Sequence, residues 1–248
     1  GLGDVYKRQF LRLFEDKNCV LQAEGSDQWG NITTGIDLIR KKTGKEAYGF
    51  TMPLVLDKTG KKFGKSEGNA LWLDKNKTSS YELYQYLVNV DDSLVIDYLK
   101  IFTFLSREEI EEYARKNNEH PEEREAHIAL AREIITDIRG EEEYLKAKKI
   151  SDCLFKGDIT LLDEDELEDA FKGAPSFDIN VGDKVIDMLI NAKICSSKRE
   201  AREFISAGSI SINGEKVSDE GDVITSDKLL YNKYLIVRKG KKKYYIGK

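Results

Sequence analysis

Two short polar segments hold the residues best suited to phosphate chemistry. The first, Lys62-Phe63-Gly64-Lys65-Ser66, places two lysines three positions apart in a stretch that contains glycine. It begins 31 residues after Asn31, the last residue of the second segment, Gly25-Ser26-Asp27-Gln28-Trp29-Gly30-Asn31. Ammonium groups on a loop can follow the charge of a polyphosphate as that charge develops. Together the two segments predict a nucleotide site.

The elements around these segments are typical of an α/β domain over residues 10–75. The apolar periodicity predicts a short helix around Phe10 to Phe14, and a second helix with Asn31 as its N-cap. Turn residues bound three expected strands, at residues 19–23, 50–56 and 70–73. This order places the glycine-bracketed turn between a strand and a helix, and the lysine loop after a strand.

From Ser79 onward the pattern is helical, and residues 76–156 are expected to form an all-α domain. Ser79 with Glu82, and Ser106 with Glu109, have the spacing of capping boxes. Pro121 stands where a further helix would begin. The acidic, apolar-poor residues 157–181 then indicate a linker with at most one helix.

Residues 182–248 are expected to form a small α+β domain. Ser197 caps a helix that carries Lys198, Arg199 and Arg202 on one exposed side, and Asn213-Gly214 between alternating strands predicts a tight hairpin. This end has 14 Lys or Arg against 9 Asp or Glu, a charge of +5, whereas the preceding residues carry −10. A basic end on an acidic body favours a polyanion partner, most simply nucleic acid. Lys241, Lys242 and Lys243, next to two tyrosines, add charge and stacking surface.

The remaining composition points to a reduced, metal-free protein of the cytoplasm. Cys19, Cys153 and Cys195 are scattered, and only His120 and His127 are available as histidine ligands for zinc. No apolar run approaches the roughly 18 residues of a membrane-spanning helix. We therefore expect no protein-bound metal and no membrane partner.

The motifs resemble those of bacterial tyrosyl-tRNA synthetase, a family of class I aminoacyl-tRNA synthetases, from about Phe10 to Lys248. Three of them agree in order: the turn at residues 25–31, the lysine loop and Phe102-Thr103-Phe104-Leu105-Ser106. The last 67 residues resemble a small RNA-binding domain that this family shares with a ribosomal protein. The resemblance implies the C-terminal part of a Rossmann-like catalytic domain, then an all-α domain on the anticodon side and the small α+β RNA-binding domain.

The resemblance also implies a reaction and roles for residues. ATP, with Mg²⁺, would activate L-tyrosine to tyrosyl-adenylate, and the tyrosyl group would pass to tRNA(Tyr) without a protein nucleophile. Gly25 and Asp27 would hold the ribose, Gln28 the activated acyl phosphate, and Gln22 would line the tyrosine pocket. Lys62, Lys65 and Ser66 would hold the pyrophosphate.

The family's His-x-Gly-His signature is not found in this sequence, and neither is the helix that binds the substrate amino group. Residues 1–9 do not resemble the family, so we expect foreign sequence joined to an N-terminally truncated chain. Such a chain would be inactive in tyrosine activation. The complete protein would form a homodimer, whereas the surfaces that form it would lie upstream of this chain.

Simpler interpretations remain open from the residues alone. Lysine pairs also occur at solvated hairpin tips, Asp27 and Gln28 could merely cap a helix, and Lys198 with its neighbours could be only a soluble face. A second function, a stand-alone RNA-binding protein without catalysis, also fits the basic C-terminal part.

Overall fold

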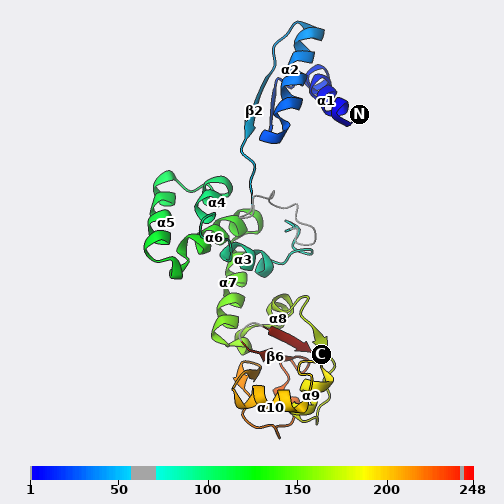
Figure 1. Ribbon diagram of the computed structural model, residues 1–248, viewed down its shortest axis with the longest axis vertical. Coiled ribbons are helices and arrows are strands. Elements are labelled where there is room, and N and C mark those ends of the chain that lie inside the picture. Colours follow the sequence, from blue (N-terminus) through cyan, green and yellow to red (C-terminus); the bar gives the residue numbers. More distant parts are fainter. Residues whose placement is uncertain (1, 57–70, 241–242) are drawn as a thin grey trace. The chain divides into compact units, whose positions relative to one another are not determined.

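The computed structural model describes residues 2–56, 71–240 and 243–248, and Figure 1 shows their helices and strands. The chain divides into two compact units, residues 1–70 and 71–248. We describe each unit by itself. No described helix is both long enough and apolar enough to span a membrane.

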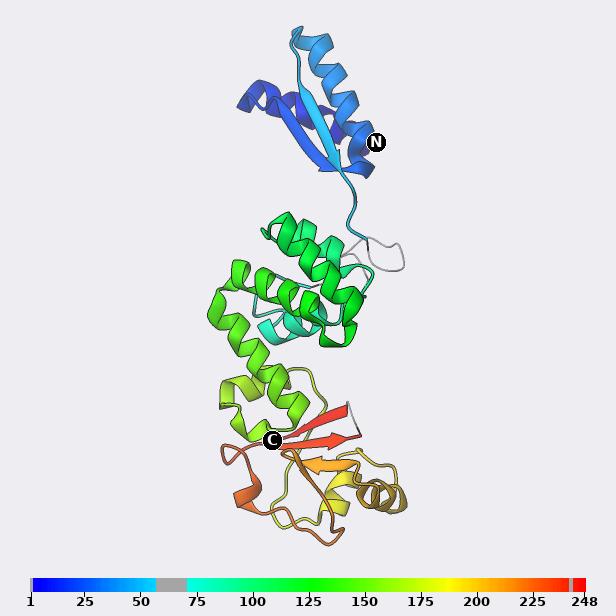
Figure 2. The same cartoon turned by 90° about the vertical axis from the view of Figure 1, so that its left-hand side faces the viewer.

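The first unit contains a strand, helix, strand sequence with parallel strands. β1 (Leu21–Gly25) pairs with β2 (Tyr48–Met52) in a register that runs from Leu21 opposite Tyr48 to Gly25 opposite Met52. Between them lies α2 (Trp29–Thr43), which ends at Gly44 in the left-handed conformation. A Cβ at Gly49 would lie 2.3 Å from Ile32 Cγ2, so glycine allows β2 to lie directly against α2 (Figure 2). The predicted α/β character of this part is confirmed.

Helix α1 (Leu2–Lys17) is longer than the expected helix at Phe10 to Phe14. It packs on α2 where Phe10, fully buried, meets Gly35, and the small core there also includes Phe14 and Ile39. The prediction that Asn31 caps α2 is wrong, because the helix begins two residues earlier, at Trp29. β1 is displaced by two residues toward the C-terminus from the expected strand, and β2 begins two residues and ends four residues before the expected bounds.

The second unit begins with helices, as the sequence predicts. Both expected capping boxes are present: the Ser79 and Ser106 hydroxyls accept hydrogen bonds from the Glu82 and Glu109 amides, and the two glutamate carboxylates accept from the backbone amides of the serines. Pro121 opens a short 3-10 turn, η2 (Pro121–Glu123). The helices are α3 (Ser80–Val88), α4 (Val95–Phe102), α5 (Arg107–Glu119), α6 (Glu125–Arg139) and α7 (Glu141–Lys156).

The strand expected at residues 70–73 is wrong for the described residues 71–73, which form no strand. Arg139 explains the difference, because its guanidinium donates to the carbonyl oxygens of Trp72 at 3.2 Å, Leu73 at 3.1 Å and Thr78 at 2.9 Å. The Trp72 amide donates to the Thr78 hydroxyl at 3.0 Å. With these backbone groups already paired, the segment wraps around one arginine and does not join a sheet.

The C-terminal part contains a five-stranded sheet in the order β3-β7-β6-β4-β5. Only β3 with β7 is a parallel pair. Two helices, α9 (Val185–Asn191) and α10 (Lys198–Ser206), precede the hairpin as expected. The strands are β3 (Ser176–Phe177), β4 (Ile210–Ile212), β5 (Glu215–Lys216), β6 (Leu235–Lys239) and β7 (Lys243–Gly247).

Each face of this sheet has its own core, because neighbouring residues of a strand point to opposite sides. On β6, Leu235 and Val237 join the core formed with α9 and α10. Tyr234 and Ile236 join a second core with the end of α7 and with α8 (Glu164–Ala170). The sheet therefore lies between two pairs of helices, as Figure 1 shows.

Residues 157–181, expected as a linker, pack into this unit instead of running free. Ile159, Leu162 and Leu167 are at most 2% exposed, and they join the second core beside Ile236 and Ile246. The segment includes α8 and the sheet strand β3. Its acidic composition reflects the outer side of α8, and Phe171 is buried together with these three residues, whereas Leu161 and Val181 are exposed.

The turn of the β4–β5 hairpin lies in close contact with the end of α7. Asn213 has φ 51° and Gly214 has φ 92°, the pair of positive values that the predicted Asn-Gly turn requires. A Cβ at Gly214 would lie 2.0 Å from the Gly157 carbonyl oxygen. Gly157 ends α7 with φ 91°, so two glycines join the hairpin tip to the end of α7.

We expect Gly214→Ala to lower the free energy of unfolding by at least about 2 kcal/mol more than Gly173→Ala. Both substitutions place Cβ at a positive φ, but nothing lies within 4 Å of a Cβ at Gly173. Urea titrations followed by Trp72 fluorescence in a Trp29→Phe background would measure both. Equal losses would contradict the close contact.

His127 on α6 is fully buried in the helical part. Its Nε2 lies 3.0 Å from the Val90 carbonyl oxygen and 3.1 Å from Asp92 Oδ1, whereas Nδ1 has no partner among the described residues. Burial lowers the pKa of His127 below its usual value, and nearby Arg124 acts in the same direction. The folded protein therefore holds this imidazole neutral.

We expect the free energy of unfolding to fall as the pH drops below about 6.5, the usual pKa of histidine. There the unfolded chain binds a proton more readily than the folded protein does, so stability is lost at a rate of at most about 1.4 kcal/mol per pH unit. His127→Gln keeps a side-chain donor near Val90 but cannot titrate. Urea titrations followed by Trp72 fluorescence between pH 7 and pH 5 would measure the free energy of unfolding of both proteins. If this free energy depends on pH in the same way in the unaltered protein and in His127→Gln, the role of His127 is contradicted.

Candidate functional site

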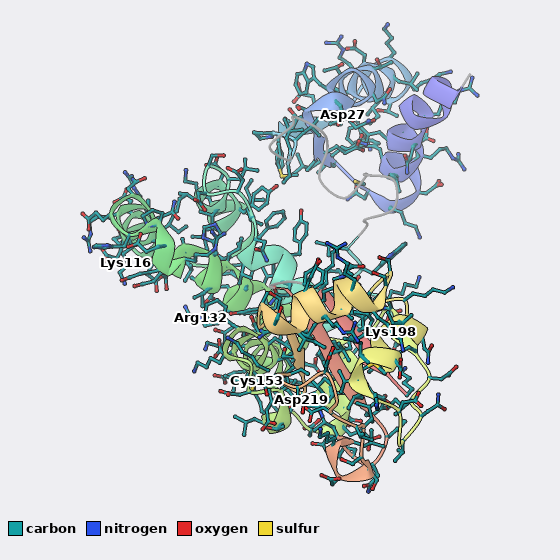
Figure 3. All side chains as sticks on the ribbon, turned by 60° about the horizontal axis from the view of Figure 1, so that its bottom comes forward. Asp27, Lys116, Arg132, Cys153, Lys198 and Asp219 are labelled. Carbon is teal, nitrogen blue, oxygen red and sulfur yellow. The ribbon has the colours of Figure 1, made fainter. Side chains whose placement is uncertain are left out.

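The first candidate site is the turn at the carboxyl end of β1. Gly25 ends the strand, Ser26–Gln28 form a 3-10 turn, and α2 follows at Trp29. In α/β sheets, ligands bind outside the carboxyl ends of parallel strands. A Cβ at Gly25 would lie 2.9 Å from Asp27 Oδ1, so only glycine leaves the Asp27 carboxylate where it is. Figure 3 labels Asp27 in this turn.

Three polar side chains of the turn form one hydrogen-bonded row. Asn31 Nδ2 donates to Gln28 Oε1 at 2.8 Å, and Gln28 Nε2 donates to Asp27 Oδ2 at 3.3 Å. The Asn31 amide orients the Gln28 amide, which in turn donates to the Asp27 carboxylate. The row therefore holds this carboxylate in place as a hydrogen-bond acceptor. Asn31 was missed as a site residue, and its spacing of three from Gln28 on a helix was the available signal.

Gln22 lies three residues before the turn, on β1. Its side-chain Nε2 donates to the Glu24 carboxylate, whereas Oε1 is buried and has no hydrogen-bond partner among the described residues. A buried acceptor without a donor is costly. Gln22 therefore offers a ready acceptor for a donor group of a bound molecule.

Five predicted site residues lie outside the described residues. They are Lys62, Lys65, Ser66, Lys241 and Lys242. The structure therefore brings Gly25, Asp27 and Gln28 together on one turn, and the lysine loop stays a prediction.

The second candidate site is the exposed side of α10, where Figure 3 labels Lys198. The side chains of Lys198, Arg199 and Arg202 are 60%, 90% and 59% exposed. Each is paired with a carboxylate: Lys198 with Asp187 at 2.7 Å, Arg199 with Glu203 at 3.1 Å, and Arg202 with Glu220 at 2.5 Å.. Exposed ion pairs of this kind contribute about 0–1 kcal/mol, so phosphates could replace the carboxylates.

The partner carboxylates were not predicted. Glu203 stands four residues after Arg199 on the same helix, a spacing that the sequence already shows. Asp187 and Glu220 lie on other parts of the chain, and only the fold brings them to α10.

Another cation, Lys239, holds α10 to the sheet. It donates to Glu200 at 2.8 Å and to the Ile194 carbonyl oxygen at 2.8 Å. Hydrogen bonds from Lys239 and from Ser196 lower the pKa of Glu200 to about 2. Lys243, the remaining predicted cation that the structure describes, is the first residue of β7, directly opposite Lys239, and is exposed. Lys239 is thus structural, whereas Lys243 is available to a partner.

The described residues contain no group of three or more His, Cys, Asp or Glu side chains placed to hold a metal ion. Cys153 and Cys195 are buried, and burial raises the pKa of both thiols. Neither thiol is therefore poised as a nucleophile.

Two family models match the chain. The model of tRNA synthetases class I (W and Y) matches residues 9–156, and that of the Tyrosine--tRNA ligase SYY-like C-terminal domain matches residues 166–246. The chain belongs to the class I tRNA synthetases of the tryptophan and tyrosine group.

Within that group, the chain is similar to proteins named tyrosine--tRNA ligase. It is 50% identical to the one from Geobacillus kaustophilus over 239 residues and 47% identical to tyrosine--tRNA ligase 1 from Bacillus licheniformis over 240 residues. Each alignment covers 96% of this chain and 57% of the relative, so the chain spans little more than half of these proteins.

A solved structure with a similar fold is a C-terminally truncated mitochondrial tyrosyl-tRNA synthetase from Aspergillus nidulans. Its TM-score is 0.51 at 33% identity, over 62% of this chain and 44% of that one. The resemblance stated from the motifs is confirmed.

If α10 contacts RNA, Lys198→Ala with Arg202→Ala should weaken binding of tRNA(Tyr) about tenfold or more and flatten its salt dependence. Each lost phosphate contact lowers the slope of log K against log salt by about 0.7–0.9. Fluorescence anisotropy of labelled tRNA at several salt concentrations would measure both quantities.

The matched control is Arg12→Ala with Arg40→Ala, which removes two exposed cations that are also paired with carboxylates on their own helices, outside the parts of the chain proposed to contact tRNA. It should leave the slope nearly unchanged. Equal effects of the two double variants would count against α10 as the contact surface.

Proposed function

We propose that this chain is part of a tyrosine--tRNA ligase, which uses ATP to activate L-tyrosine to tyrosyl-adenylate and transfers the tyrosyl group to tRNA(Tyr). The observation that carries the proposal is the joint match of both family models, in order, along a chain of which 96% aligns with proteins of that name. The geometry of the turn after β1 supports it.

The turn suits the sugar of a nucleotide better than its phosphates. The Asp27 carboxylate is an acceptor and would repel phosphate oxygens, but it accepts hydrogen bonds from hydroxyl groups. Gly25 and Asp27 would therefore hold the ribose. Gln28 would contact the acyl phosphate, and the unpartnered Gln22 Oε1 would accept a hydrogen bond in the tyrosine pocket.

The phosphates require cations from another segment. Lys62 and Lys65, with Ser66, would supply them and would stabilise the pyrophosphate as it leaves. Mg²⁺ would enter with ATP as part of the substrate, since Mg²⁺ is commonly held by substrate phosphates and one or two carboxylates. Positioning and charge stabilisation then suffice for the reaction without a protein nucleophile.

The C-terminal part would bind tRNA(Tyr) through Lys198, Arg199 and Arg202 together with Lys241, Lys242 and Lys243. In this proposal, residues 10–75 contain the nucleotide site, residues 76–156 form the all-α domain on the anticodon side, and residues 182–248 form the small RNA-binding domain. A homodimer in the cytoplasm is proposed for the complete protein, by analogy with the family.

A stand-alone RNA-binding role is the second candidate. The mixed-charge face of α10 and the exposed Lys243 favour RNA binding independently of any catalysis. Isothermal titration of this chain separates the two functions, because tRNA binding without any ATP binding would favour the second for this chain.

In the complete gene product that contains this chain, Lys62→Ala with Lys65→Ala should slow tyrosine-dependent ATP–pyrophosphate exchange about a hundredfold or more. Removing one preorganised charge-stabilising donor typically costs a factor of 10²–10³. The matched control is Lys41→Ala with Lys45→Ala, two exposed lysines near the end of α2. An unchanged exchange rate for the loop variant, or equal losses for both variants, would refute the assigned role.

A further inference from the structure

Phe155 is the most unusual apolar side chain of the C-terminal part, because it is 90% exposed although it belongs to the last turn of α7. Its neighbour Leu154 is 9% exposed and joins the second core. Beside Phe155 lies a cavity of about 500 Å³, large enough for a nucleotide. The cavity is lined by Leu154, Phe155, Gly208, Ser209, Lys216, Arg238 and Gly240.

Two cations form the wall of this cavity on the sheet. Ser211 on β4 lies directly opposite Arg238 on β6 and opposite Lys216 on β5, so the three side chains share one face of the sheet. Arg238 Nε donates to the Ser211 hydroxyl at 3.2 Å. Neither Lys216 nor Arg238 forms an ion pair with a described carboxylate, in contrast to the three cations of α10.

Phe155 also lines a second cavity, of about 610 Å³. That cavity contains the neutral amides of Gln85 and Asn89 and a single cation, Lys172, which donates to the Asn76 carbonyl oxygen at 2.9 Å. The two cavities therefore differ in the charge of the residues that line them. Phosphate is favoured beside Lys216 and Arg238, and base edges are favoured beside the amides.

The end of α7 is held firmly, so Phe155 projects from a fixed support. The Gly157 and Gly214 backbones are in direct contact, and the Tyr244 hydroxyl donates to the Leu154 carbonyl oxygen at 3.3 Å. An exposed aromatic ring on a fixed element loses little conformational freedom when a flat partner stacks on it.

We propose that Phe155, Lys216 and Arg238 form a binding site for an unpaired nucleotide of RNA, whose base stacks on Phe155 and whose phosphate lies against the two cations. This inference rests on the proposed RNA-binding function and adds to it a contact with single-stranded RNA, apart from the α10 surface. An exposed aromatic ring next to unpaired cations is the arrangement by which proteins hold single strands. A paired nucleotide could not stack there, because both faces of its base are already covered.

The test measures binding of labelled tRNA(Tyr) to the whole chain by fluorescence anisotropy at several salt concentrations. Phe155→Ala should weaken binding roughly tenfold with an unchanged salt slope, because stacking involves no counterion release. Phe155→Trp should retain binding. Lys216→Ala with Arg238→Gln should weaken binding and lower the slope by about 1.4.

Two controls accompany these variants. Leu145→Ala removes another apolar side chain from α7 that is 53% exposed, and it should leave affinity unchanged. A fully paired RNA duplex should bind Phe155→Ala and the unaltered chain equally. Sedimentation of each protein would show whether Phe155→Ala changes the oligomeric state.

Unchanged tRNA affinity in Phe155→Ala would overturn the inference and leave the proposed function intact, provided that the α10 variants still lose affinity. A change of oligomeric state without a change of affinity would also overturn it, since the surface would then be a protein interface. If the unaltered chain does not bind tRNA(Tyr), both the inference and the RNA-binding part of the proposed function fail.

Discussion

The contact between the Gly157 and Gly214 backbones is the constraint on which the C-terminal part depends. Helix α7 begins among the helices and ends on the sheet, where Ile150, Cys153 and Leu154 join the core that includes Ile236 and Ile246. A side chain at Gly214 would hold the helix end away from the hairpin and would open that core. The helical part and the sheet therefore form one unit, as the division of the chain at residue 70 also indicates.

The alternation of the strands then determines which surfaces remain for binding. On β6, Leu235 and Val237 face α9 and α10, and Lys239 at the end of the strand donates to Glu200 of α10. On the side of α7, Tyr234 and Ile236 are fully buried, whereas Arg238 is partly exposed and lines the cavity beside Phe155. On this face the sheet is thus covered at its apolar side chains and more open at Arg238. The same helix end that closes the core places Phe155 at the border of the open part.

The features that the sequence predicted correctly depend on neighbouring residues. The capping boxes at Ser79 and Ser106 and the turn at Asn213-Gly214 each involve residues at most three positions apart, so their signals are readable in a short stretch. Two features predicted wrongly depend on distant residues. The Arg139 guanidinium donates hydrogen bonds to the carbonyl oxygens of Trp72 and Leu73. The expected linker packs against strands that lie more than 60 residues further on. Composition alone could not predict either of these two features, because only the fold brings the contacting residues together.

The candidate nucleotide site likewise combines a turn formed by neighbouring residues with a requirement for residues from another segment. The motif at residues 25–31 predicted the turn, and the structure explains why glycine precedes the acid: a Cβ at Gly25 would displace Asp27. The turn itself offers a carboxylate and amides, which suit hydroxyl groups but not polyphosphate. Any nucleotide held there must therefore have its phosphates neutralised from elsewhere. A cationic loop that follows β2 is suited to this role, because β1 and β2 are parallel and their carboxyl ends lie at the same edge of the sheet. The roles proposed for the acidic turn and for the lysine loop are thus complementary, because the carboxylate suits hydroxyl groups and the ammonium groups suit phosphates.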